Sequence, residues 1–218
     1  MIELTPQRVD ELSARAEQFY NPKLALHNWN HPLEVRRDFD QIIDNYLGGR
    51  RKFGPAMSLN RAPVYLAIAH HDDEHDSPEN ANYPSKEAYA AFIARRELAG
   101  EVEPEIVDEV EGIILATRLQ APRVTLGQVA AHYADVWSMA EKDHEVFLDV
   151  NTRLWIEAGR PPWEGYKRRA RKVIAITIEE SLREFCPRVA AWGGDPYHFP
   201  IYAKKNMEQF ANDPEPGL

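Results

Sequence analysis

Six consecutive side chains that can ionise or bind a metal follow a short apolar run that begins at Leu66. They are His71, Asp72, Asp73, Glu74, His75 and Asp76, and His70 comes directly before them. Imidazole and carboxylate groups together suit a divalent transition metal, and an adjacent carboxylate can accept a proton. The segment therefore indicates a metal site with an acid or base beside it, and the rest of the chain must supply the scaffold and further ligands.

The His71-Asp72 pair needs a partner, because an unpaired carboxylate in an apolar environment is costly. A metal ion or an arginine would serve. Adjacent residues of a regular helix point about 100° apart, so both can reach one ion only from a helix end or a distorted turn. The alternative is a solvated acidic helix C-terminus, which the helix dipole disfavours. A bound cation removes that conflict, so we favour a metal.

Further candidate ligands stand elsewhere in the chain. His27 and His31 are four residues apart, and they either bind one ion from a helix or lie as polar residues in a loop. Their segment lacks the glutamate of a zinc-protease motif. His31 precedes a proline that suits the first turn of a helix, so it can be aimed inward from the helix entrance. Asp135 lies in an amphipathic stretch, where its carboxylate needs a partner. That partner is a metal, an arginine or His132, which lies one turn earlier.

Two basic runs, 50–52 and 167–172, stand in an otherwise acidic chain. Arginine forks match phosphate oxygens, so either run can clamp a phosphate, although such runs more often form a solvated helix face. Trp29 is the one tryptophan of the sequence that lies within a candidate motif, where it could stack on a nucleotide base. The other tryptophans fit a core or a pocket wall.

Helical spacing of apolar residues recurs along the chain, whereas convincing alternation with a period of two does not. The spacing predicts helices that include 6–20, 61–71, 125–141, 161–185 and 201–211. Pro187 is expected to stop the long helix, and 191–200 is expected to form a loop. We therefore expect an all-α fold, a single domain over residues 1–218 that is built from about eight helices.

Composition excludes several classes of protein. The 218 residues carry a net charge of −9, from 26 basic and 35 acidic residues, which argues against nucleic-acid binding through phosphate neutralisation. The single cysteine, Cys186, excludes a disulfide framework and fits a reducing compartment. The sequence has no apolar run of 18 residues and no signal-peptide pattern. We expect a cytoplasmic protein without a nucleic-acid or membrane partner, and leave homo-oligomer formation open.

The candidate ligands, in this order, resemble the HD-domain superfamily of metal-dependent phosphohydrolases. That pattern is a histidine, a His-Asp pair at the end of a buried helix and a distant aspartate on a helical scaffold. Here His31, His71-Asp72 and Asp135 match it. Over about 18–210 the chain is most similar to the small bacterial proteins described as predicted metal-dependent HD phosphohydrolases. Their motifs resemble the segments from Tyr20 to His31, Leu66 to Asp76, Ile113 to Thr117, Ala134 to Val136 and Ala203 to Asn206.

Some positions depart from that family pattern. Leu24 and Leu26 stand where the family has an arginine and a tyrosine before its first histidine motif. The family has an Asn-Glu-Glu-like segment after its His-Asp pair, and here only Glu87 of that segment is present. The family also has a histidine soon after its Ala-Thr, whereas here Arg118 follows Ala-Thr. The metal-ligand pattern is thus retained, while its surroundings differ.

The resemblance implies an HD-like bundle that hydrolyses a small phosphate ester, with a nucleotide as first choice, through a metal-activated water. His31, His71, Asp72 and Asp135 would hold one divalent cation, which is Mn, Zn, Mg, Fe, Co or Ni. Asp76 is the preferred general acid or base, ahead of His75 and Glu74. The expected substrate-binding residues are His27, Trp29, Arg50, Lys52, Glu87, Arg168 and Arg171. The alternatives are a non-catalytic metal- or nucleotide-binding module and a helical interaction protein without a metal.

Overall fold

The computed structural model describes residues 4–46, 59–191 and 193–217. Within these ranges the chain forms nine α-helices and no β-strand, which confirms the all-α prediction. The helices are α1 (Pro6–Ala14), α2 (Asn30–Asn45), α3 (Arg61–His70), α4 (Lys86–Leu98), α5 (Pro104–Thr117), α6 (Leu126–Asp135), α7 (His144–Glu157), α8 (Trp163–Ala191) and α9 (His198–Phe210). Short 3₁₀ segments add η1 (Arg15–Phe19), η3 (Pro78–Asn82) and η4 (Trp137–Ala140).

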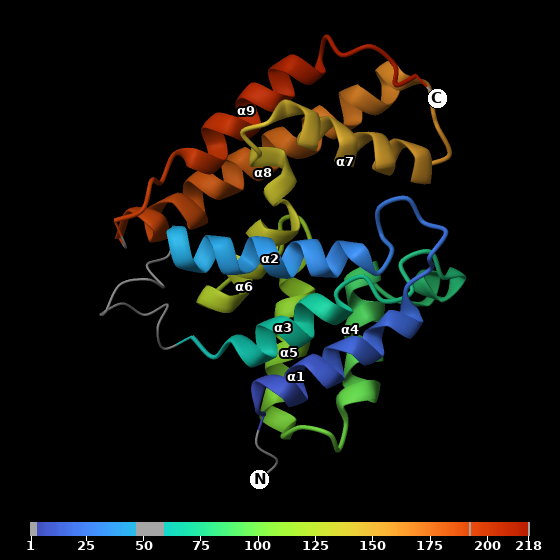
Figure 1. The fold of residues 1–218 in the computed structure, drawn as a ribbon, viewed down its shortest axis with the longest axis vertical. Coiled ribbons are helices and arrows are strands. Elements are labelled where there is room, and N and C mark those ends of the chain that lie inside the picture. The colour runs from blue at the N-terminus through green and yellow to red at the C-terminus, as the bar shows by residue number, and fades with distance from the viewer. Residues whose placement is uncertain (1–3, 47–58, 192, 218) are drawn as a thin grey trace.

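Helix α2 runs through the middle of the bundle. In Figure 1, α7, α8 and α9 lie above it, and α1, α3, α4 and α5 lie below. Its closest helical neighbours are α6 and α3. The start of α2, the end of α3 and the end of α6 therefore come from elements that pack directly against one another, which is what the candidate ligands require. Among the described helices none has the length and apolarity of a membrane span.

Local sequence signals fix where several helices begin. Thr5 caps α1 by accepting a hydrogen bond from the Arg8 backbone N–H, with a proline at the first helical position. Thr125 and Gln128 form a capping box at the start of α6. Each cap satisfies backbone N–H groups that the first turn of a helix leaves without partners.

An aromatic cluster joins α8 and α9 to α6. The ring of Tyr133 lies 4.5 Å from that of Phe185 on α8 and 5.2 Å from that of Phe199 on α9. Trp137 in η4 packs against the same phenylalanines. These four side chains are at most 4% exposed, so their burial stabilises the placement of α8 and α9 beside the end of α6.

The prediction that Pro187 stops the long helix is wrong. Helix α8 continues through Pro187 to Ala191, and buried Cys186 and Val189 on either side pack into the core. Proline removes one helical hydrogen bond, but core packing can outweigh that loss. The helix ends near Gly194, whose N–H bonds the carbonyl of Val189.

Other predicted boundaries also differ from the structure. The loop expected over 191–200 is shorter, because α9 begins at His198 and accommodates Pro200 in its first turn, where backbone N–H groups have no helical partner. The helix expected over 125–141 is divided into α6 and η4. Asp135 is consequently the last residue of α6 and not part of a helix interior.

Candidate metal centre

The end of α3 presents the His71-Asp72 pair. Helix α3 is almost entirely apolar and buried, so it ends inside the protein. It stops at His70, and residues 71–76 form consecutive turns in which Glu74 has a left-handed backbone with φ of +49°. His71 is the cap residue and still has helical backbone angles, with φ of −65° and ψ of −24°, and Asp72 lies in the turns beyond it. His71 and Asp72 can therefore point toward the same place.

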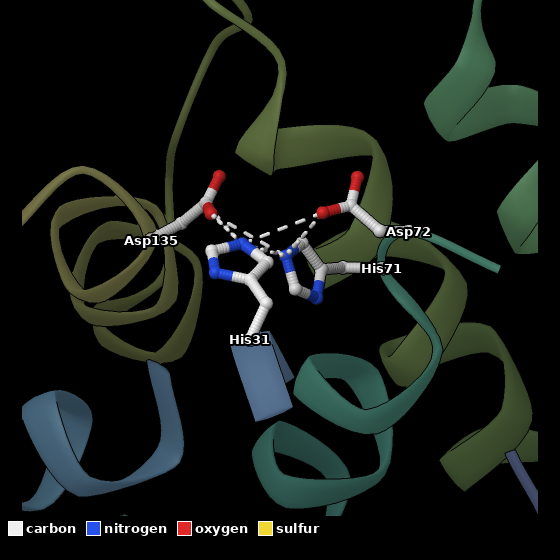
Figure 2. Close-up of side chains that lie close together, drawn as sticks. All are labelled: His31, His71, Asp72 and Asp135. Carbon is white, nitrogen blue, oxygen red and sulfur yellow. Dashed lines mark hydrogen bonds and ion pairs between the residues drawn. The ribbon is translucent and has the colours of Figure 1, made fainter. Parts of the chain in front are cut away.

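The other two candidate ligands stand at helix ends that face this turn. His31 is the second residue of α2 and is 7% exposed, as expected for a histidine aimed inward from a helix entrance. Asp135 closes α6. Figure 2 shows the side chains of His31, His71, Asp72 and Asp135 pointing toward a common centre.

The donor atoms of these four residues are close enough to share one ion. His71 Nε2 lies 3.0 Å from Asp72 Oδ2, 3.3 Å from Asp135 Oδ1 and 3.3 Å from His31 Nε2. His31 Nε2 lies 3.4 Å from Asp72 Oδ2 and 3.1 Å from Asp135 Oδ1. An ion about 2.1 Å from each donor keeps neighbouring donors about 3.0 Å apart in octahedral and about 3.4 Å apart in tetrahedral coordination. The donor spacing thus fits a first-row divalent ion.

The tautomer of His71 also fits a metal ligand. Its Nδ1 lies 2.7 Å from the carbonyl oxygen of Ile68 and donates a proton to it. In the neutral imidazole the Nε2 lone pair then faces the other three ligands. A backbone acceptor behind a ligating histidine is the usual way in which proteins fix the ring and its tautomer.

Charge is concentrated at this centre. Burial acts to lower the pKa of His71, but the carboxylates of Asp72 and Asp135 outweigh it and raise that pKa well above its ordinary value. Burial acts to raise the pKa of each carboxyl, and His71 with the neighbouring histidines instead lowers both. Two partly buried carboxylates therefore require a positive partner, which is either a proton on the histidines or a metal ion.

A second group of side chains borders the first. Asp72 Oδ1 lies 3.2 Å from His75 Nδ1, and the ring of His75 stacks on that of His27 at 3.7 Å between centroids and 10° between planes. Donor atoms of His27, Asp72 and His75 also lie within 4.8 Å of one another. Parallel rings do not aim both of their nitrogen lone pairs at one point, so we describe these histidines as the surroundings of the first group.

Glu157 and Lys86 contact these histidines, and sequence reasoning missed both. Glu157, at the end of α7, accepts hydrogen bonds of 3.1 Å from the backbone N–H groups of Leu26 and His27 and also contacts His27 Nδ1. Burial opposes the effect, but these bonds and the charge of His27 lower the pKa of Glu157 to about 2. Lys86 Nζ lies 2.6 Å from His75 Nε2. A carboxylate at a helix end between apolar residues was the available signal for Glu157.

The predicted acid or base residues lie in different places. Asp76, the first choice, is exposed and accepts a hydrogen bond of 2.7 Å from Asn21 Nδ2. Glu74 accepts one of 2.9 Å from the hydroxyl of Tyr89. Neither carboxylate belongs to the two groups of possible metal ligands. His75 is the candidate that the structure brings into contact with a ligand.

The predicted substrate-binding residues are scattered. Trp29 packs on Tyr20 at 5.4 Å and lines a groove between α1, α2 and α3. Glu87 lies in the first turn of α4 and is outside both groups. Arg168 and Arg171 are exposed on α8. Of these residues His27 is the one beside the ligands, and Arg50 and Lys52 lie outside the described residues.

The alternative partners weighed for Asp135 contact other groups. His132 Nδ1 lies 2.9 Å from the carbonyl oxygen of Thr117 and 3.0 Å from Arg123 Nη2. Arg123 in turn pairs with Glu184 at 2.6 Å. Asp135 contacts His31 and His71 instead, as a shared ligand group requires.

A small cavity of about 170 Å³ reaches the ligand group, with His31 and Asp135 in its wall. Met139 and Leu154 line this cavity and also a second one, of about 340 Å³, between α7 and α8. The ligand group is therefore accessible from the side of η4 and α7.

Neither the models of known protein families nor the curated protein sequences match this chain. Its fold and site define it as an all-helical protein in which two imidazoles and two carboxylates converge, an arrangement compatible with one divalent ion.

Proposed function

We propose that this protein is a metal-dependent phosphohydrolase that acts on a small phosphate ester. The observation that carries the proposal is the convergence of His31, His71, Asp72 and Asp135, in which the histidine Nε2 atoms lie 3.0–3.4 Å from each other and from the carboxylate oxygens. The order of these ligands along the chain is the one for which the sequence resembles the HD-domain superfamily. A nucleotide remains the substrate suggested by that resemblance.

A divalent ion in this group supplies Lewis acidity and lowers the pKa of a water molecule that it binds. In the proposed reaction a water oxygen forms a bond to phosphorus, the ester P–O bond breaks, and the leaving alkoxide takes up a proton. His31, His71, Asp72 and Asp135 would hold the ion, and the burial of the two histidines restricts their movement. Their task is orientation, which accounts for much of the catalytic effect of such sites.

His75 is our choice for the proton exchange. An imidazole can act as a general acid or base, and His75 lies 3.2 Å from Asp72, next to the centre. Lys86, 2.6 Å from His75 on its other side, brings a cation toward a phosphate oxygen. His27, held by Glu157, forms the adjoining wall.

The test combines metal analysis with phosphate release. The protein is loaded with Mn²⁺, Zn²⁺ or Co²⁺ and assayed with a panel of phosphate esters and nucleotides, with and without a chelator. His71→Ala and Asp72→Ala should each lose the bound metal and the phosphate release while circular dichroism remains helical. His144→Ala, on α7 outside the ligand group, is the matched control and should retain the metal. Phosphate release that persists in both ligand variants contradicts the proposal.

One observation favours a second candidate, a non-catalytic metal-binding module. The small cavity that reaches the ligand group carries Glu34 and Asp38 in its wall, and carboxylates repel an anionic substrate. The same experiment separates the two candidates. One equivalent of metal without turnover of any ester would support the binding module.

A further inference from the structure

We propose that the substrate is a phosphate monoester with an apolar organic group, and that this group binds in the larger cavity between α7 and α8. The proposal rests on the proposed function for the position of the phosphate at the ligand group. It narrows the small phosphate ester of the proposed function to this class, in place of a nucleotide.

The larger cavity is apolar and of the size that small ligands use. Its volume is about 340 Å³. Pockets for small molecules run from about 300 to about 1,000 Å³ and have mainly apolar walls with a few polar groups. The apolar side chains of its wall come from η4, α7 and α8 and include Met139, Val150, Leu154, Val173 and Ile174.

This cavity adjoins the one that reaches the candidate ligands. Ser138, Met139, Val150 and Leu154 line both cavities. The smaller cavity has His31 and Asp135 in its wall. An ester whose phosphate lies at His31 and Asp135 can therefore extend its organic group over Met139 and Leu154 into the apolar space.

The arrangement of α7 and α8 explains why apolar side chains remain open here. The helices meet where the rings of Trp155 and Trp163 pack at 5.3 Å. Beyond that end, α7 packs against η4 and α9 and not closely against α8. Val173, in the cavity wall, is 39% exposed, which leaves apolar surface that a ligand would remove from water.

Two polar side chains of the wall, Asn151 and Tyr166, offer little to a nucleobase. Asn151 Nδ2 donates to the carbonyl oxygen of Phe147 at 3.0 Å, and its Oδ1 accepts from the hydroxyl of Tyr166 at 3.4 Å. These groups are therefore already bonded within the protein. A base edge buried in such a wall would lose hydrogen bonds to water without replacement, whereas an alkyl or aryl group would not.

The basic run over 167–172 contributes to the cavity through Arg169. Arg169 and Ala170 are part of the cavity wall, whereas Arg168 and Arg171, the two arginines chosen from the sequence, point to solvent. The aliphatic part of an arginine can cover an apolar ligand while its guanidinium stays in water. Arg169 thus fits the edge of an apolar site without a phosphate-binding role.

The direct test is a homologous series of substrates. The metal-loaded protein is assayed with methyl, butyl, hexyl and octyl phosphate and with nucleoside 5′-monophosphates. We expect kcat/KM to rise up to about fourfold per methylene, equivalent to about 0.8 kcal/mol, until the cavity is filled. A kcat/KM that does not change with chain length, or a preference for nucleotides over octyl phosphate, would overturn the proposal.

A cavity-filling variant tests whether the dependence of kcat/KM on chain length arises in this cavity. Ala170→Phe places a ring in the cavity and should lower the octyl-to-methyl ratio of kcat/KM at least tenfold. Glu179→Phe introduces the same ring at an exposed position of α8 outside the cavity and should leave that ratio unchanged. Equal ratios in the two variants would contradict the assignment of this cavity.

Binding of phosphonates separates this inference from the proposed function. Octylphosphonate and methylphosphonate, which are not hydrolysed, are compared by calorimetry on the Mn²⁺-loaded protein. Tighter binding of octylphosphonate supports the cavity even if no ester is hydrolysed. The absence of hydrolysis would then overturn the phosphohydrolase activity and leave the cavity assignment in place. Equal affinities overturn the cavity assignment even where phosphate release is observed.

Discussion

His71 Nε2 and Asp72 Oδ2 lie 3.0 Å apart although the two residues are neighbours in the chain. On a continuing helix their side chains would diverge by about 100°. Helix α3 ends at His70, and Asp72 lies in the turns that follow. The end of a buried helix is thus what allows two adjacent residues to serve one centre.

Metal affinity should weaken as the pH falls. In the metal-free protein the carboxylates of Asp72 and Asp135 raise the pKa of His71, so a proton competes with the metal for Nε2. Calorimetric titration with Zn²⁺ from pH 8 to pH 6 should show a rising Kd together with proton release. A Kd that stays constant over this range would show that His71 is not a ligand.

Glu157 should contribute to stability through the segment that carries His27. Its carboxylate accepts hydrogen bonds from the backbone N–H groups of Leu26 and His27, which Glu157→Ala would leave without that partner. We expect Glu157→Ala to lower the free energy of unfolding by about 1–3 kcal/mol in urea titrations. Glu145→Ala, at an exposed position of the same helix, is the control and should change it by less than about 0.5 kcal/mol.

The sequence was sufficient to predict much of the fold because the signals are local. Thr5 and Thr125 mark helix starts through caps that involve residues three positions away. The end of α8 depends instead on tertiary packing. Buried Cys186 and Val189 favour continuation of the helix, and a sequence window around Pro187 does not reveal their neighbours.

Part of the candidate site could likewise be predicted from the sequence, and part of it could not. His71 and Asp72 could be recognised from their residue types and from the apolar helix before them. Glu157 could not be connected with His27, because 130 positions separate them and the contact depends on how α7 packs. The place of Asp76 in a motif favours it over His75, but in the structure Asp76 contacts Asn21 and it is His75 that contacts Asp72.

His132 should make the protein less stable in acid. Burial and the positive charge of Arg123 lower its pKa to about 4, below an unfolded value of about 6.5. The unfolded chain therefore takes up a proton first, and the stability that is present above pH 6.5 is lost as the pH falls toward 4. The loss is about 3 kcal/mol.

The corresponding variant is His132→Gln, which keeps polar atoms but does not titrate. The difference in free energy of unfolding between the wild type and this variant should change in favour of the variant between pH 7 and pH 4.5. Two parallel stability curves over that range would show that His132 does not titrate differently in the folded and unfolded states.

Gly194 should be required for the close approach between the end of α8 and the end of α2. A Cβ at this position would lie 2.6 Å from the carbonyl oxygen of Tyr46 and 2.8 Å from Val189 Cγ1. Backbone cannot yield as a flexible side chain does, so Gly194→Ala should destabilise the protein by about 1–3 kcal/mol. Gly112→Ala in α5 is the matched change, because its Cβ meets Gln128 Nε2 at an ordinary 3.5 Å. It should stabilise the protein by about 0.5–1 kcal/mol through helix propensity, and equal melting temperatures for the two variants would contradict this account of how α8 ends.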